Sequence, residues 1–273
     1  MNFEEANLNA VSKQIYEVSG KMQIRFETIF TENETSCIAE CVEASGGRWG
    51  VEVKDFKQTS GALIDVLSAD LAAAIDKLVF QIGEQETLLN ILNMEEVLEN
   101  WRLKKQFLVE KHSEIPDFGS ICDNFGDNLK NETKLLSSVE NKGVYALLFP
   151  QVRHSGYGRI PNEIYRTKTI AESVLAKDLP IAEKVSIREN GAELLAEVKG
   201  ELDKDKFDYA GFLHSAKQMF GGHLTADDIA FQGTENYSLD KTTLRYTSGT
   251  RHHFFEIKGS YFRDEKQTFR LQE

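Results

Sequence analysis

Hydrophobic and polar residues alternate from residue 14 to about residue 56 with a period of two, which is typical of half-buried β-strands, whereas residues 1–13 predict a short, frayed helix. In residues 22–27, Met, Ile and Phe alternate with Gln, Arg and Glu. Cys37–Ala44 predicts a second strand, and a third begins near Trp49. The glycines at 46–47 predict a hairpin between them, because glycine adopts positive φ without strain. The pattern therefore predicts an antiparallel meander.

The period then changes to three and four, which is typical of amphipathic helices. Residues 61–77 predict one helix and residues 93–111 another. The second begins at Asn93, a favourable N-cap, and acidic residues follow in its first turn. Residues 78–92 predict a hairpin between these helices, and residues 120–149 predict one or two more helices.

The second half returns to the strand period. Asn190 and Gly191 form a strong hairpin dipeptide. Residues 208–220 predict a helix that ends at two glycines, and residues 229–271 predict a closing β-meander. The turns predicted within this meander are at residues 233–234, 248–249 and 264–265.

The order of strands and helices predicts an α+β fold in which antiparallel β-meanders are each covered by helices. Two related half-barrel-like units are one arrangement that fits this order. Residues 150–161 hold two of the four prolines and two of the nineteen glycines, which predicts a linker or a functional loop. We therefore expect an N-terminal domain of residues 1–150, with a β-meander plus helices, and a C-terminal domain of residues 151–273, with an antiparallel sheet and one helix.

Composition narrows the class of protein. With 41% hydrophobic and 28% charged residues among 273, the chain can build a globular core. Its formal net charge of -12 disfavours nucleic acid and anionic membranes as partners. Its first residues lack a signal-peptide pattern, and its three cysteines have no disulfide spacing, so we expect a cytoplasmic protein.

The sequence contains no strong metal-binding or catalytic motif. His252 and His253 are adjacent on a predicted strand, so their side chains point to opposite faces and cannot share a metal ion. We expect no metal, no cofactor and no catalytic residue that the sequence can identify. A composite site of His154, His214 and His223 with nearby acids is the alternative that spacing alone leaves open.

Aromatic residues on the C-terminal strands are the best predicted contact surface, because exposed strands and aromatic side chains recur at protein interfaces. The predicted partner-binding residues are Tyr246, Phe254, Phe255, Tyr261 and Phe262, with Tyr157 and Arg159 in the loop. The first hypothesis is a non-catalytic binding or assembly protein that acts through protein–protein contacts or self-association. The alternatives are a carrier of a small apolar ligand in a cavity between sheet and helix, and an enzyme with a composite site.

Overall fold

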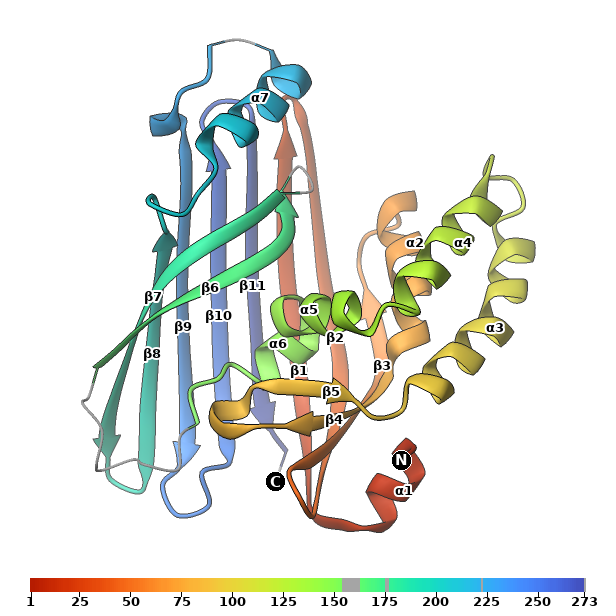
Figure 1. The fold of residues 1–273 in the computed structure, drawn as a ribbon, viewed down its shortest axis with the longest axis vertical. Coiled ribbons are helices and arrows are strands. Elements are labelled where there is room, and N and C mark those ends of the chain that lie inside the picture. Colours follow the sequence, from red (N-terminus) through yellow and green to blue (C-terminus); the bar gives the residue numbers. More distant parts are fainter. Residues whose placement is uncertain (154–162, 175–176, 222, 273) are drawn as a thin grey trace. The chain divides into compact units, whose positions relative to one another are not determined.

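The computed structural model describes residues 1–153, 163–174, 177–221 and 223–272. Its strands form one antiparallel sheet in the order β5-β4-β3-β2-β1-β11-β10-β9-β8-β7-β6 (Figure 1). The strands are β1 Ala10–Phe26, β2 Ile29–Ala44, β3 Arg48–Gln58, β4 Lys77–Ile82, β5 Leu88–Ile91, β6 Glu163–Val174, β7 Lys177–Asn190, β8 Glu193–Leu202, β9 Ile229–Asp240, β10 Tyr246–Ile257 and β11 Tyr261–Leu271. The predicted α+β class is confirmed, and the sheet is open, with β5 and β6 at its edges.

The sequence segments whose apolar residues recur every three or four positions form helices in the structure. They are α1 Phe3–Leu8, α2 Leu63–Ala72, α3 Met94–Lys111, α4 Phe118–Leu129, α5 Glu132–Asn141, α6 Gly143–Leu148 and α7 Tyr209–Phe220, with short 3-10 turns η1 Ala73–Ile75, η2 Glu84–Glu86 and η3 Ala226–Asp228. Residues 120–149, predicted as one or two helices, belong to three. Across the described ranges, no helix is long and apolar enough to span a membrane.

The chain groups into two compact units. Unit 1 contains residues 1–17, 37–151 and 272, and unit 2 contains residues 18–36 and 152–271. The strands β1 and β2 contribute residues to both units, so each unit is described by itself below.

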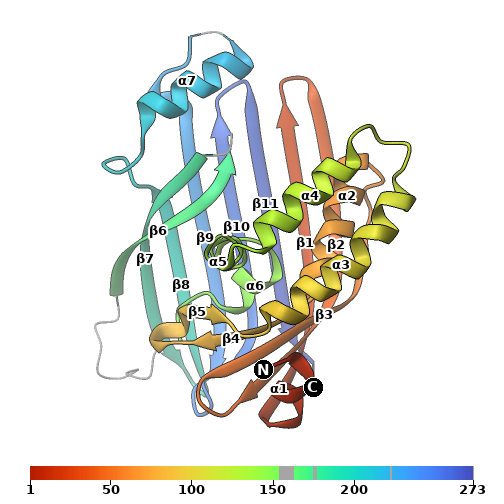
Figure 2. The same ribbon diagram turned by 45° about the vertical axis from the view of Figure 1, so that its right-hand side comes forward.

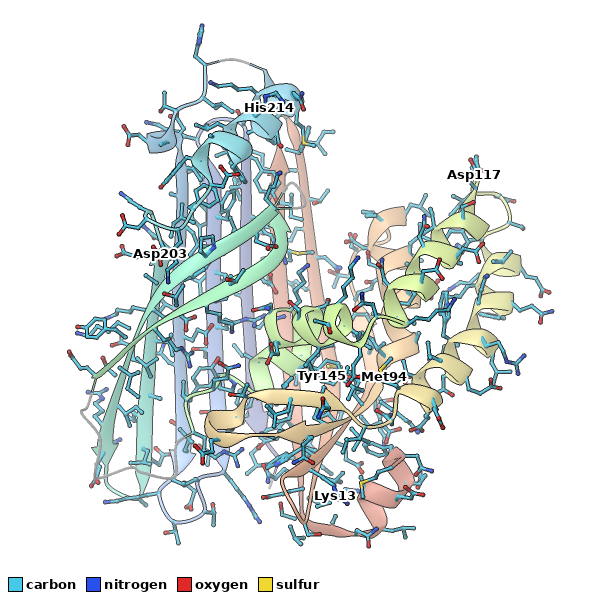
Figure 3. All side chains as sticks on the ribbon, in the orientation of Figure 1. Lys13, Met94, Asp117, Tyr145, Asp203 and His214 are labelled. Atoms are coloured by element: carbon cyan, nitrogen blue, oxygen red, sulfur yellow. The ribbon has the colours of Figure 1, made fainter. Side chains whose placement is uncertain are left out.

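Unit 1 has an aromatic core. Phe80 of β4 lies 5.6 Å from the ring of Tyr145 in α6 and 5.7 Å from Phe149 (Tyr145 is labelled in Figure 3). Trp101 of α3 lies over Gly126 of α4, where any larger side chain would collide with the indole. This close approach lets α3 and α4 pack as neighbouring helices (Figure 2).

Unit 2 is a sheet with one helix on one face. The helix α7 lies over the end of the sheet where β9 begins (Figures 1 and 2). Along β9 the odd-numbered residues from 229 to 239 are buried, whereas the even-numbered residues are exposed or half-buried. We call the face of β6–β11 that carries Phe231 and Phe255, on which α7 packs, the helix face. We call the opposite face, which carries Thr234 and His252, the polar face.

Three predicted turns in the C-terminal meander are wrong. Residues 233–234 lie inside β9, 248–249 inside β10 and 264–265 inside β11, and the turns are at residues 241–245 and 258–260. The Asp240 side chain accepts backbone hydrogen bonds that close the first turn, and a glycine with φ of 78° lies in the second. Gly249 instead makes room for the rings of Tyr237 and Phe269, which lie over it.

Replacing Gly249 with alanine should therefore destabilise the protein by about 1–3 kcal/mol, the usual cost of overpacking a core. A methyl group there would overlap both rings, one of them buried on each neighbouring strand. Urea denaturation measures the change. Gly61→Ala is the matched control, because its new methyl group meets no atom within 4 Å. Equal midpoints for the two variants would contradict this account of Gly249.

Candidate functional site

A belt of charged side chains crosses the helix face of unit 2. The strand register places its members on this face in adjacent rows, where residue 235 is opposite 251 and residue 253 is opposite 265. We call this group the charged belt; it consists of Arg166, Lys168, Glu183, Glu235, Arg251, His253, Arg263 and Glu265. Glu183, Glu235 and Arg251 are 6%, 4% and 3% exposed, so they are buried ionisable groups of the kind that needs specific partners.

Glu235 is held by two donors. The Tyr237 hydroxyl donates to its Oε2 at 2.8 Å, and His253 Nε2 lies 2.9 Å from its Oε1. Burial, the largest influence, would raise the pKa of Glu235, but the His253 hydrogen bond and the positive charges of His253, Lys168 and Arg251 outweigh it. The pKa of this carboxyl therefore lies well below its ordinary value, and Glu235 is ionised.

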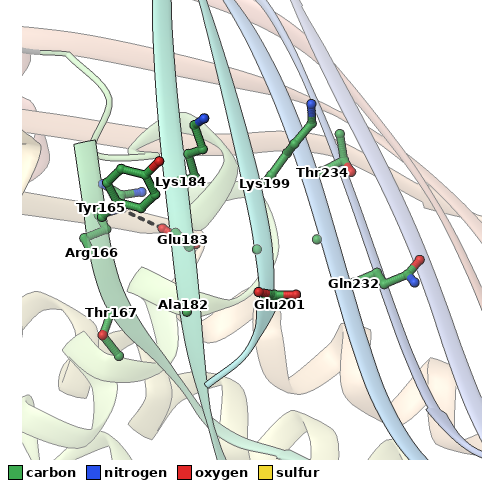
Figure 4. A pocket seen from close by; sticks show the side chains of 12 residues that line it. Tyr165, Arg166, Thr167, Ala182, Glu183, Lys184, Lys199, Glu201, Gln232 and Thr234 are labelled. Carbon is green, nitrogen blue, oxygen red and sulfur yellow. Dashed lines mark hydrogen bonds and ion pairs between the residues drawn. The ribbon is translucent and has the colours of Figure 1, made fainter. Parts of the chain in front are cut away.

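The other carboxylates of the belt also have partners. Arg166 Nε donates to Glu183 Oε2 at 2.6 Å, as drawn in Figure 4, and Arg263 Nη2 donates to Glu265 Oε2 at 2.6 Å. Burial would raise the pKa of Glu265, but the charges of Arg263 and Arg251 lower it overall. The carboxylates are thus satisfied inside the belt.

Aromatic rows lie on both sides of the belt. On the side of α7, Phe212 packs 5.9 Å from Phe255, and both belong to a buried cluster with Phe231. On the other side, the ring of Tyr237 lies 5.8 Å from Tyr246 and 6.3 Å from Phe269. The helix face of unit 2 is therefore apolar at both ends and charged in the middle.

The polar face carries a second candidate site, a hollow of about 670 Å³ over β6–β9. Figure 4 shows Lys184, Lys199 and Thr234 next to one another on neighbouring strands. Lys184 pairs with Glu163 at 2.7 Å, and Lys199 pairs with Glu197 at 3.0 Å. The hollow is lined by Tyr165, Arg166, Thr167, Ala182, Glu183, Lys184, Lys199, Gly200, Glu201, Gln232, Gly233 and Thr234. Its ammonium groups are already neutralised by exposed carboxylates, so it has little preference for charge.

The predicted partner-binding residues separate between the two faces. Tyr246 and Phe255 are buried on the helix face, and Tyr261 packs against the cluster beneath α7. Phe254 and Phe262 lie on the polar face with ring centroids 6.1 Å apart. The last two, Tyr157 and Arg159, lie outside the described residues.

The histidines follow the strand geometry. His252 binds Asp264 at 2.7 Å on the polar face, whereas His253 binds Glu235 on the helix face. His214 lies on α7, where it contacts Gln218, and His154 lies outside the described residues (Figure 3). Among the residues that the structure describes, no three His, Cys, Asp or Glu side chains form a group that could hold a metal ion.

Sequence reasoning missed the charged belt. The sequence did contain one signal for it, the alternation of strand residues between the two faces. Glu235, Arg251 and Glu265 occupy odd-numbered positions, as the buried aromatic residues of their strands do. In the sequence, a single charge at such a position only interrupts the alternation of apolar and polar residues. The pairing of β9, β10 and β11 is needed to show that these charges are neighbours.

Comparisons with known proteins identify the fold alone. No family model matches the chain, and no curated protein does. A solved structure on lipid–protein interactions in lipovitellin has a similar fold, with a TM-score of 0.53 and 9% sequence identity. The match covers 96% of this chain and 25% of that chain, so this chain spans about a quarter of lipovitellin's length.

The belt makes stability depend on pH. The pKa of Glu235 is depressed in the folded protein, so its stabilisation is present above about pH 4.5 and is lost as the pH falls further. Glu235→Gln should cost about 1.5–3 kcal/mol at pH 7, the range for hydrogen bonds to a charged group. The difference from wild type should shrink between pH 5 and pH 3.

Urea denaturation at a series of pH values measures this dependence. Glu201→Gln, on the exposed polar face, is the control and should shift the curve little. A constant difference between Glu235→Gln and wild type across this range would contradict the assignment of an ionised, buried Glu235.

Proposed function

We propose that the protein binds an apolar, lipid-like ligand on the helix face of unit 2. The observation that carries the proposal is the composition of this face, where buried aromatic residues flank a charged belt in which Glu183, Glu235 and Arg251 are buried. Burying charges at the centre of a face costs free energy that apolar residues avoid, so stability alone does not favour them there. An amphipathic ligand has the same combination of an apolar chain and a polar group.

The helix α7 is suited to act as a cover for such a ligand. It is twelve residues long and fully buries only Phe212 and Ala216 against the sheet. It ends at Gly221, whose φ of 69° suits a glycine better than other residues. Tyr209, Leu213 and Phe220 pack against the same cluster but stay partly exposed. A single helix at the end of a sheet opens at lower free energy than the hydrogen-bonded strands beneath it. Opening would expose the aromatic cluster of Phe231 and Phe255 to a ligand.

The likeness to lipovitellin supports the proposal by analogy of fold. Lipovitellin is the subject of a structure on lipid–protein interactions, and this chain resembles part of it. At 9% identity the likeness concerns the path of the chain and not its side chains.

Photolabelling tests the proposal. An alkyl probe with a diazirine in its chain should bind at a stoichiometry near one, and mass spectrometry of the labelled peptides should locate it. We expect labels on β9–β11 residues of the helix face, such as Phe231, Tyr237 and Phe255. Excess unlabelled long-chain alcohol should compete, whereas butanol should not. No saturable binding, or labels confined to Phe254 and Phe262 on the polar face, would reject the proposal.

A second candidate function, self-association, is favoured by an aromatic patch on the polar face. Phe30 is 54% exposed and its ring lies 6.3 Å from that of Phe262, which in turn stacks near Phe254. The guanidinium of Arg25 lies 5.0 Å from the centre of the Phe262 ring. Aromatic residues and arginine are enriched at protein interfaces, and this patch combines both.

Sedimentation velocity over a range of concentrations tests this second candidate. If the patch joins two copies, Phe262→Ser should weaken the dimer at least tenfold, or ~1.4 kcal/mol. Thr250→Ala, on the polar face of the same sheet, should leave the dimer unchanged. A wild-type protein that is monomeric at every concentration would rule out self-association through this patch.

A further inference from the structure

Arg251 is a buried cation of the charged belt whose hydrogen bonding is incomplete. It is 3% exposed, and its Nε has no hydrogen-bond partner among the described residues. Its Nη2 donates to Gln267 at 2.5 Å and lies 3.6 Å from Glu265 Oε1, too far for a strong hydrogen bond. A buried guanidinium with a free N–H is costly, because each of its five donors loses water on burial.

The carboxylates near Arg251 are already occupied. Glu235 accepts from Tyr237 and contacts His253, and Glu265 accepts from Arg263 at 2.6 Å. The belt holds four cations, Arg166, Lys168, Arg251 and Arg263, against three carboxylates, Glu183, Glu235 and Glu265. The arginines and lysine of the belt therefore outnumber its carboxylates by one, and the buried Nε of Arg251 is a donor among them that lacks a partner within the described ranges.

The surroundings of Arg251 define what could supply the missing anion. The row of Tyr237 and Phe269 lies on one side of Arg251. The row of His253 and Glu265 lies on the other side, with Phe231 and Phe255 beyond it, so a ligand that reaches Arg251 meets aromatic rings on one side and belt residues on the other. A guanidinium binds a carboxylate through two parallel N–H donors, and Nε is one donor of such a pair. An alkyl chain would then continue over the aromatic rows.

We propose that Arg251 binds the carboxylate of a long-chain fatty acid on the helix face of unit 2. This inference rests on the proposed function, since it names the headgroup of the apolar ligand. The ligand's anion neutralises the surplus charge of the belt, and its chain covers the rings that flank it. A neutral ligand of the same length would leave the Nε of Arg251 without a partner.

The test compares palmitic acid with hexadecanol, which differ only in the headgroup. Both are titrated into the purified full chain at pH 7.5 by displacement of a fluorescent alkyl probe. Wild type should bind the acid about tenfold more tightly than the alcohol, because only the acid can form a charge-assisted hydrogen bond with the guanidinium. Arg251→Met should weaken the binding of palmitic acid about tenfold and leave the binding of hexadecanol unchanged. Arg270→Met, an exposed arginine on β11, is the matched control and should change neither.

The outcomes separate the two proposals. If neither ligand binds wild type, the carrier function fails. If acid and alcohol bind wild type equally, or if Arg251→Met weakens both by the same factor, the carrier function stands and the role of Arg251 is overturned. Tighter binding of hexadecyl phosphate than of palmitic acid would overturn the choice of a carboxylate.

A spectroscopic measurement covers the case in which Arg251→Met does not fold. Palmitic acid with ¹³C at its carboxyl carbon is bound to wild type, and its chemical shift is followed as the pH is lowered. Contact with Arg251 should keep the bound carboxylate ionised to a lower pH than the same acid in a neutral detergent micelle. A bound acid that takes up its proton at the same pH as in the micelle, or at a higher one, would overturn the proposal.

Discussion

Unit 2 depends on the burial of charge at the centre of a β-sheet face. Glu235 is 4% exposed and Arg251 is 3% exposed, and neither could be ionised there without partners on neighbouring strands. The partners come from three strands, since Tyr237 and His253 contact Glu235 and Gln267 contacts Arg251. A shift of one residue in the register would turn these side chains to the opposite face and leave them unpaired. The charged belt therefore fixes the register of β9, β10 and β11 more strictly than apolar packing would.

Two glycines of the C-terminal strands leave room for aromatic side chains on the helix face. Gly233 and Gly249 lack side chains where the rings of Phe231, Tyr237 and Phe269 lie across the sheet. Aromatic rings can then lie along the face beside the charged belt. Unit 1 uses a different solution, in which helices with small residues at their contacts pack against aromatic side chains, as Gly126 does beneath Trp101.

Hydrophobic periodicity predicted the class of fold and most of its elements. The helices over residues 61–77, 93–111 and 208–220 and the hairpins at 46–47 and 190–191 follow from local patterns, because capping residues and glycines act within a few positions. The three wrong turns share one cause: Ser248–Gly249 and the others look like turns locally, but cross-strand contacts keep them in strands. The charged belt could not be predicted for a related reason, since its members are close only through the pairing of strands that lie far apart in the sequence.

The open sheet has a long strand at one edge. β6 is twelve residues long and pairs with β7 on one side, and such edges can pair with strands of other chains. Half of the side chains in residues 163–168 are charged, and they are of both signs: Glu163, Arg166 and Lys168. An incoming strand would have to match or desolvate these charges, two of which, Glu163 and Arg166, already pair with residues of β7. The edge thus favours a chain that remains dispersed at high concentration over one that assembles into extended fibres.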